Sequence, residues 1–353
     1  MKRLLTWGFI LLGLIATGLV VSRLVLQRRV AARISITSPS GIDSLETVSL
    51  GGTDQWILIR GWDRTKPLLL FLHGGPGFPE MPFAHVNTAL ERDFVVVHWD
   101  QRGAGKSYPA PKQSLDVEQF VSDTRELTDL LLKRFSAQKL VVVGHSWGSL
   151  VGALAVARDP NKFFAYVGIS QFADAPESER MMYQWALERA EQTSQVQAAR
   201  ELKRIGLPPY ESMRDFRTMK RWVAHFNAAD YRPISRLQFV RLAFASPVYS
   251  WRDLMNLAWG VRTSFDELWR EVFYKTNLLR DAPRIDVPVY LFEGRHDRQV
   301  TVSAAMAERY FAALDTPRGK QLIWFENSGH WPQLQEPEKF HAVLSQTVVK
   351  DLR

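Results

Sequence analysis

The chain has 353 residues, of which 46% are apolar, so it is long enough for one large hydrophobic core that carries an inserted subdomain. It contains no cysteine, which excludes disulfides, thiolate metal sites and a cysteine nucleophile. The net charge is +8, but residues 1–33 alone hold six Lys or Arg and no acid, and the remaining 39 basic and 37 acidic residues nearly balance. The basic excess therefore lies at the N-terminus, where it favours anionic membrane lipid as a partner over nucleic acid.

The first predicted element is an apolar helix. Residues 4–22 run for 19 residues without an ionisable side chain. As a helix they would be about 28 Å long, close to the roughly 30 Å hydrocarbon core of a bilayer, so we expect a single-pass membrane anchor. The alternative is a cleaved signal peptide, because residues 16–18 resemble a cleavage site, although apolar residues continue beyond them. Two basic residues precede the span and four follow it, which favours a cytoplasmic catalytic domain, with the opposite orientation left open.

Beyond a polar linker, short apolar runs alternate with helical patterns. Strands are predicted as a hairpin over 46–61 and as runs at 67–72, 94–99, 139–144, 165–170, 288–293 and 321–326. Helices are predicted at 117–135, from 147 onward, at 302–314 and at 337–349. This alternation predicts a mostly parallel sheet that is covered by helices on both faces.

One long stretch, about residues 172–285, interrupts the alternation. It reads as mainly helical and carries five tryptophans, most of which we expect to pack inside it. An insertion between two sheet strands lies at the edge where α/β proteins bind ligands, so this stretch is predicted to form a cap. The predicted organisation is an anchor (1–33), a core in two parts (34–171 and 286–353) and the cap between them.

The candidate nucleophile lies in Gly144-His145-Ser146-Trp147-Gly148, which fits G-x-S-x-G between a predicted strand and a predicted helix. That context is the one a nucleophile elbow requires, with Ser146 on a sharp turn and the Trp147 N–H beside its hydroxyl. The flanking glycines relieve crowding against the neighbouring strand and helix. His145 is expected to pack within the elbow rather than to act as the base.

An activated serine needs a histidine and a carboxylate, which follow it in the order acid, then histidine, in this kind of fold. Asp297 follows one predicted strand and His330 follows the next, so both lie at the same edge as the elbow, with Glu293 as a nearby alternative acid. The second oxyanion donor is predicted to be Gly75, or alternatively Gly74, in the glycine-rich run after the strand at 67–72.

Two other kinds of site are not expected. Residues 100–107, DQRGAGKS, end like a P-loop, but Asp100 occupies the position that requires glycine. No H-E-x-x-H or comparable metal-ligand pattern occurs, so neither a metal nor another cofactor is predicted.

Three motifs together resemble the proline iminopeptidase branch of the α/β-hydrolases (peptidase family S33), over roughly residues 45–350: HGGPG at 73–77, DQRGAGKS at 100–107 and GHSWGS at 144–149. The resemblance implies an eight-stranded core with a helical cap and a triad of Ser146, Asp297 and His330. It also implies an oxyanion hole built from the Gly75 and Trp147 N–H groups.

In that family, cap glutamates hold the free amino group of the substrate, and one of them follows a W-x-x-W-E type motif that this sequence lacks. Glu177, Glu179 and Glu188 are the candidates for this role, and nothing in the sequence selects among them.

The leading prediction is a membrane-anchored aminopeptidase that acts through an acyl-enzyme on a small peptide. The alternatives are a carboxylesterase or lipase acting on acyl esters, or an inactive hydrolase fold that serves as a binding module. The sequence does not predict the oligomeric state.

Overall fold

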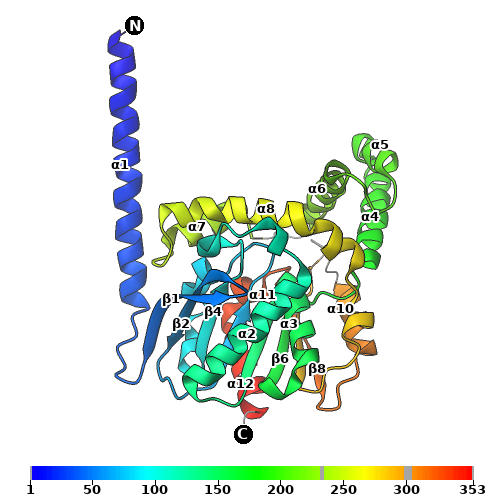
Figure 1. Ribbon diagram of the computed structural model, residues 1–353. Helices are drawn as coiled ribbons and strands as arrows, with labels where there is room; N and C mark the ends of the chain where they lie inside the picture. Colours follow the sequence, from blue (N-terminus) through cyan, green and yellow to red (C-terminus); the bar gives the residue numbers. More distant parts are fainter. Residues whose placement is uncertain (1, 231–233, 298–303, 352–353) are drawn as a thin grey trace.

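The computed structural model describes residues 2–230, 234–297 and 304–351, and an eight-stranded sheet forms its centre (Figure 1). The strands follow the order β1-β2-β4-β3-β5-β6-β7-β8. β1 and β2 form an antiparallel hairpin, β2 pairs antiparallel with β4, and the remaining neighbours are parallel. The parallel strands therefore end at one common edge of the sheet.

All the predicted strands and helices are present, with small shifts at their ends. The strands are β1 (Ile42–Leu50), β2 (Thr53–Gly61), β3 (Leu68–Leu72), β4 (Val95–Asp100), β5 (Leu140–His145), β6 (Phe163–Ile169), β7 (Val289–Gly294) and β8 (Lys320–Phe325). The core helices are α2 (Val117–Phe135), α3 (Trp147–Arg158), α10 (Ala304–Ala313), α11 (Pro332–Gln335) and α12 (Pro337–Asp351), with 3-10 turns η1 (Met81–Val86) and η2 (Thr88–Arg92). Positions 302 and 303 of the predicted helix at 302–314 lie outside the described residues.

Alternate residues of each central strand face two separate hydrophobic clusters, as expected of a sheet with helices on both faces. In β3, Leu70 belongs to the cluster that contains residues of α2, α3 and α10. The next residue, Phe71, belongs to the cluster that contains Phe340 and Leu344 of α12. Burial on both faces explains why these strands are continuous apolar runs rather than alternating ones.

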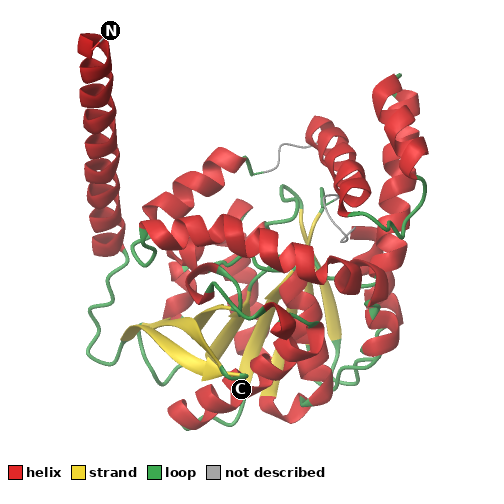
Figure 2. Cartoon of the chain, turned by 45° about the horizontal axis from the view of Figure 1, so that its top comes forward, coloured by secondary structure: helices red, strands yellow, loops and turns green. Residues whose placement is uncertain are grey.

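Between β6 and β7 the chain forms the helices α4 (Ala175–Gln192), α5 (Val196–Ile205), α6 (Met213–Asp230), α7 (Arg236–Ala245), α8 (Trp251–Lys275) and α9 (Leu278–Asp281). α8 runs across the sheet edge, and α4, α5 and α6 rise on the side away from the N-terminus (Figures 1 and 2). The expectation that the tryptophans here are packed holds for Trp269, which is buried against Phe216. The exceptions are Trp251 and Trp259, which are 44% and 53% exposed.

The N-terminal helix α1 (Lys2–Arg33) is long, apolar and largely uncovered by the rest of the chain (Figure 1). Residues Ile10–Arg33 are long and apolar enough to cross a membrane, with a mean hydropathy of 2.0. A signal sequence near an N-terminus has the same properties. At its lower end α1 packs beside α7.

Candidate active site

Ser146 lies on a sharp turn between β5 and α3, at the edge where the parallel strands end. Its backbone has φ 51° and ψ −114°, an unusual conformation for a residue with a side chain. The turn also requires its two glycines. A Cβ on Gly144 would lie 2.3 Å from the Gly148 carbonyl oxygen, and one on Gly148 would lie 2.1 Å from the Leu72 carbonyl oxygen. The sequence motif is therefore explained by the close approach of β3, β5 and α3.

Asp297 and His330 are brought together from loops that follow β7 and β8. The His330 Nδ1 lies 2.8 Å from the Asp297 Oδ2, and both side chains are buried. The loop that holds His330 is fixed by Ser170, whose hydroxyl donates to the His330 carbonyl oxygen over 3.2 Å. With Nδ1 engaged by the carboxylate, Nε2 is the ring nitrogen available for chemistry.

His145, which lies in the elbow, contacts both the His330 loop and Glu80 at the end of the glycine-rich loop. The sequence did not indicate these contacts. Its Nε2 lies 2.8 Å from the His330 carbonyl oxygen, and its ring lies 4.2 Å from that of Trp331. Its Nδ1 is 2.9 Å from Glu80 Oε1, a close contact that is not aligned as a hydrogen bond and that is an ion pair only when His145 is protonated. Glu80 in turn accepts a hydrogen bond of 2.6 Å from the Gln333 side chain. His145 and Glu80 thus connect the glycine-rich loop, the elbow and the His330 loop.

Of the two predicted oxyanion donors, Trp147 directly follows Ser146 in the chain, and Gly75 lies in the glycine-rich loop after β3. Trp147 is the first residue of α3, so its N–H is among those that a helix leaves unpaired at its start. Gly75 has φ +126°, which favours glycine at that position. The Trp147 indole donates to Gln101 over 2.9 Å, and the Gln101 amide nitrogen donates to the His73 carbonyl oxygen over 3.3 Å. These bonds hold the glycine-rich loop against the elbow.

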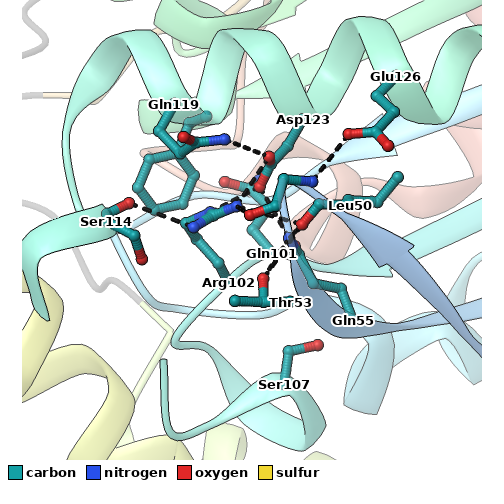
Figure 3. Close-up of polar contacts among 12 residues, drawn as sticks. Leu50, Thr53, Gln55, Gln101, Arg102, Ser107, Ser114, Gln119, Asp123 and Glu126 are labelled. Atoms are coloured by element: carbon teal, nitrogen blue, oxygen red, sulfur yellow. Dashed lines mark hydrogen bonds and ion pairs between the residues drawn. The ribbon is translucent and has the colours of Figure 1, made fainter. Parts of the chain in front are cut away.

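The P-loop-like run, residues 100–107, is bound to neighbouring parts of the chain through its charged side chains. Figure 3 shows Arg102 between Asp123 of α2 and the β1–β2 turn, and the Arg102 Nε lies 2.6 Å from the Asp123 Oδ2 with both side chains fully buried. The Lys106 ammonium forms an ion pair of 2.8 Å with Asp253 of α8. Burial raises the pKa of Asp100 to about 7, while hydrogen bonds from Tyr249 and from the Lys106 backbone oppose the shift. The charged groups of this loop therefore already have partners within the chain.

Four aromatic rings gather beside His330. Phe78 and Phe83 come from the region after the glycine-rich loop, Phe239 comes from α7, and Trp331 follows His330. Their ring centroids lie 5.1–6.0 Å apart where they touch. This aromatic wall reaches the candidate site through Trp331, whose ring centroid lies 5.9 Å from that of His330.

The three cap glutamates lie on α4 and are not brought together. Glu177 pairs with Arg180 over 2.7 Å, and Glu188 is exposed. Glu179 is fully buried and forms an ion pair with Lys220 of α6. Burial raises the pKa of Glu179, and the nearby ammonium opposes that shift. Within the described ranges, no group of three or more His, Asp or Glu side chains is arranged to hold a metal ion.

A family model for the α/β-hydrolase fold matches residues 67–337, so the chain belongs to the α/β-hydrolase family. The chain is 34% identical to the probable aminopeptidase YbaC of Bacillus subtilis over 316 residues, which cover 88% of this chain and 98% of that protein. It is 25% identical to the proline iminopeptidase of Heyndrickxia coagulans over 285 residues, covering 78% of this chain and 88% of that protein.

Among solved structures, a bacterial membrane phospholipase A superposes on 99% of this chain and on 98% of its own length. The TM-score is 0.62 and the sequence identity is 21%, so this likeness concerns the fold alone. The chain is therefore an α/β-hydrolase, a hydrolytic enzyme with curated relatives that are named aminopeptidases.

Proposed function

We propose that this enzyme hydrolyses an amide or ester bond through a covalent acyl-enzyme on Ser146. His330 Nε2 removes the proton of the Ser146 hydroxyl as its oxygen attacks the substrate carbonyl, and Asp297 orients the imidazole and stabilises its charged form. The Trp147 and Gly75 N–H groups donate hydrogen bonds to the developing oxyanion. The protonated His330 then gives its proton to the leaving group, and water activated by His330 releases the acyl group.

The observation that carries this proposal is the buried 2.8 Å contact between His330 Nδ1 and Asp297 Oδ2. Both residues follow parallel strands, as Ser146 does, so the contact lies at the same edge of the sheet as the elbow. A carboxylate on Nδ1 leaves Nε2 as the proton acceptor, which is the tautomer a serine nucleophile requires. The strained turn lifts the serine from the sheet, and the start of α3 supplies positive potential beside it.

We assign Glu80 and His145 to positioning. The His145 Nε2 bonds to the His330 carbonyl oxygen, and the Glu80 carboxylate lies against the His145 Nδ1. Because His145 directly precedes Ser146 in the chain, this pair fixes the distance between the nucleophile and the base. Neither side chain is required to touch the substrate.

The leading substrate class is a peptide with a free N-terminus, from which one residue is released. Its support is the likeness to YbaC over nearly the full length of both chains. The direct test is to compare aminoacyl amides with a free amine, the same amides after N-acetylation, and short-chain acyl esters on the full-length enzyme. An aminopeptidase cleaves the free-amine substrates with much higher kcat/KM than the acetylated amides. Equal cleavage of acetylated and free substrates overturns that assignment.

A second candidate is a carboxylesterase or lipase. The aromatic wall of Phe78, Phe83, Phe239 and Trp331 suits an apolar acyl group, and two of the three cap glutamates already have cationic partners. An esterase needs an apolar slot and no carboxylate for an amine. Higher kcat/KM for acyl esters than for aminoacyl amides favours this candidate.

We further propose that α1 is retained as a membrane anchor for the catalytic domain. The proposal is supported by its apolar length and by the docking of its lower end on the cap, where Arg23 is buried. Residues 1–33 then form the anchor, residues 34–171 and 286–353 form the catalytic core, and residues 172–285 form the cap. Recovery of the intact N-terminus in washed membranes tests retention, and a mature chain that begins near Gly18 overturns it.

A further inference from the structure

Exposed apolar side chains gather on two cap helices. Outside α1, the large hydrophobic residues described as exposed are Val196, Leu207, Leu237, Val240, Trp251, Met255 and Trp259, and five of these seven lie on α7 or α8. Those five are 44–65% exposed. In α8 they recur at every fourth residue, and in α7 they are three residues apart, so on each helix they share one face.

α7 and the first half of α8 are basic at their surface, whereas Asp266, Glu267 and Glu271 lie further along α8. Residues 234–263 hold four arginines, at positions 236, 241, 252 and 262, and all four are exposed. The sole acid in this stretch, Asp253, is mostly buried and is paired with Lys106. Exposed tryptophan and aliphatic side chains interleaved with arginine are typical of helices that lie in the headgroup layer of a bilayer.

The chain also fixes where this face lies relative to the proposed anchor. The Arg23 guanidinium is buried, donates a 2.6 Å hydrogen bond to the Tyr249 carbonyl oxygen, and stacks over Trp251 at 4.5 Å. Gln27 donates a second hydrogen bond of 2.6 Å to the Ser246 carbonyl oxygen. Arg23 is also the first charged residue after the apolar segment 4–22. The α7–α8 turn is therefore attached to α1 at the level where the apolar segment ends.

We propose that the exposed face of α7 and α8, which we call the lipid face (Leu237, Val240, Trp251, Met255 and Trp259), lies in the headgroup layer of an anionic bilayer. This proposal rests on the proposed anchoring by α1. Figures 1 and 2 both show α1 extending past α7, while α8 runs away from it across the sheet edge to the far side of the cap, where α4 and α5 rise. Lipid contacting this face would cover the exposed apolar groups, and the arginines would meet anionic headgroups.

The lipid face also bears on substrate access. Phe239 lies on α7 between Leu237 and Val240, and its ring touches Phe78 and Trp331 beside His330. One helix, about 10 Å across, thus has lipid-facing residues on one side and the wall of the candidate site on the other. This arrangement favours substrates that partition into the bilayer surface, whether they are acyl esters or hydrophobic peptides.

The absence of native cysteine allows a direct depth measurement on the full-length protein. Three single-cysteine variants, Met255→Cys, Leu12→Cys and Gln138→Cys, are labelled with bimane and reconstituted into vesicles that contain anionic lipid and chain-brominated lipid. Met255 represents the lipid face, Leu12 represents the span, and Gln138 is an exposed residue that precedes β5, away from the site edge. Leu237→Cys provides a second probe of the lipid face.

Bromolipid is expected to quench the labels at positions 12, 255 and 237 several-fold more than the label at 138, with aqueous iodide giving the reverse order. Replacing Arg241 and Arg252 by Gln is expected to reduce quenching at 255 while leaving quenching at 12 unchanged. If the label at 12 is quenched and those at 255 and 237 respond to iodide like the one at 138, the lipid face is wrong and the anchor stands. If position 12 is also exposed to iodide, the anchor itself fails.

Discussion

Replacing Glu80 by Gln tests whether the contact between Glu80 and His145 positions the base. The substitution keeps the size of the side chain and leaves an oxygen to accept the bond from Gln333, but it removes the charge 2.9 Å from His145 Nδ1. Leaving a buried polar group without its partner costs about 1–3 kcal/mol. We expect the free energy of unfolding to fall by about 2 kcal/mol. Separately, displacement of the His330 loop is expected to lower kcat roughly tenfold, which corresponds to about 1.4 kcal/mol in the activation free energy.

The assay separates positioning from general destabilisation. We expect kcat and the rate of fluorophosphonate labelling to fall together while KM changes little, since Glu80 is not expected to touch the substrate. Glu91→Gln is the matched control. Glu91 lies in η2, is buried like Glu80, and forms an ion pair with Arg60 of β2 over 2.8 Å. The control is expected to lose comparable stability but to keep kcat at temperatures where it is folded. Equal losses of kcat in both variants, or an unchanged kcat in Glu80→Gln, would refute the positioning role.

Three further predictions concern stability and the cap. The pKa of Asp100 is raised from 3.8 to about 7 by burial, so its contribution to stability is full below about pH 4 and is lost as pH rises to about 7. Between about pH 4 and 7 the free energy of unfolding, measured with urea, should therefore fall by up to about 4 kcal/mol less in Asp100→Asn than in the parent protein. Parallel plots of unfolding free energy against pH for the two proteins would contradict this. Glu179→Gln should lower the free energy of unfolding by about 3 kcal/mol by leaving the Lys220 ammonium without its partner. The double variant with Lys220→Met should recover most of that loss, and no recovery would contradict the pairing. Deleting residues 1–22, which leaves Arg23 and its cap contacts in place, should release the enzyme from vesicles that lack anionic lipid. Its kcat on a water-soluble ester should be unchanged, and a large fall in kcat would contradict a purely anchoring role.

The sequence predicted the sheet and its flanking helices because buried parallel strands are continuous apolar runs and surface helices have a 3.6-residue period. It also predicted that Asp297 and His330 lie near Ser146, since residues that follow parallel strands meet at one edge of the sheet. The structure brings Asp297 and His330 into contact, and their catalytic role stays a proposal.

The contacts of His145 with Glu80 and with the His330 loop could not be predicted in the same way. Glu80 and His330 are 250 residues apart, and no local period or spacing relates them. A histidine within a tight turn reads as packing until the groups around both of its ring nitrogens are known. The exposure of Trp251 and Trp259 was missed for a related reason, because a pattern of apolar residues does not distinguish a face covered by protein from one available to lipid.

The central claim, that Ser146 is the nucleophile of a serine hydrolase, is tested most directly by treating the full-length enzyme with a fluorophosphonate probe and locating the adduct by mass spectrometry. The account predicts a single adduct on Ser146. It further predicts that Ser146→Ala is not labelled, keeps the melting temperature of the parent protein within a few degrees, and loses several orders of magnitude in kcat. Labelling of Ser146→Ala at the parent rate, or an adduct on another residue, would contradict it.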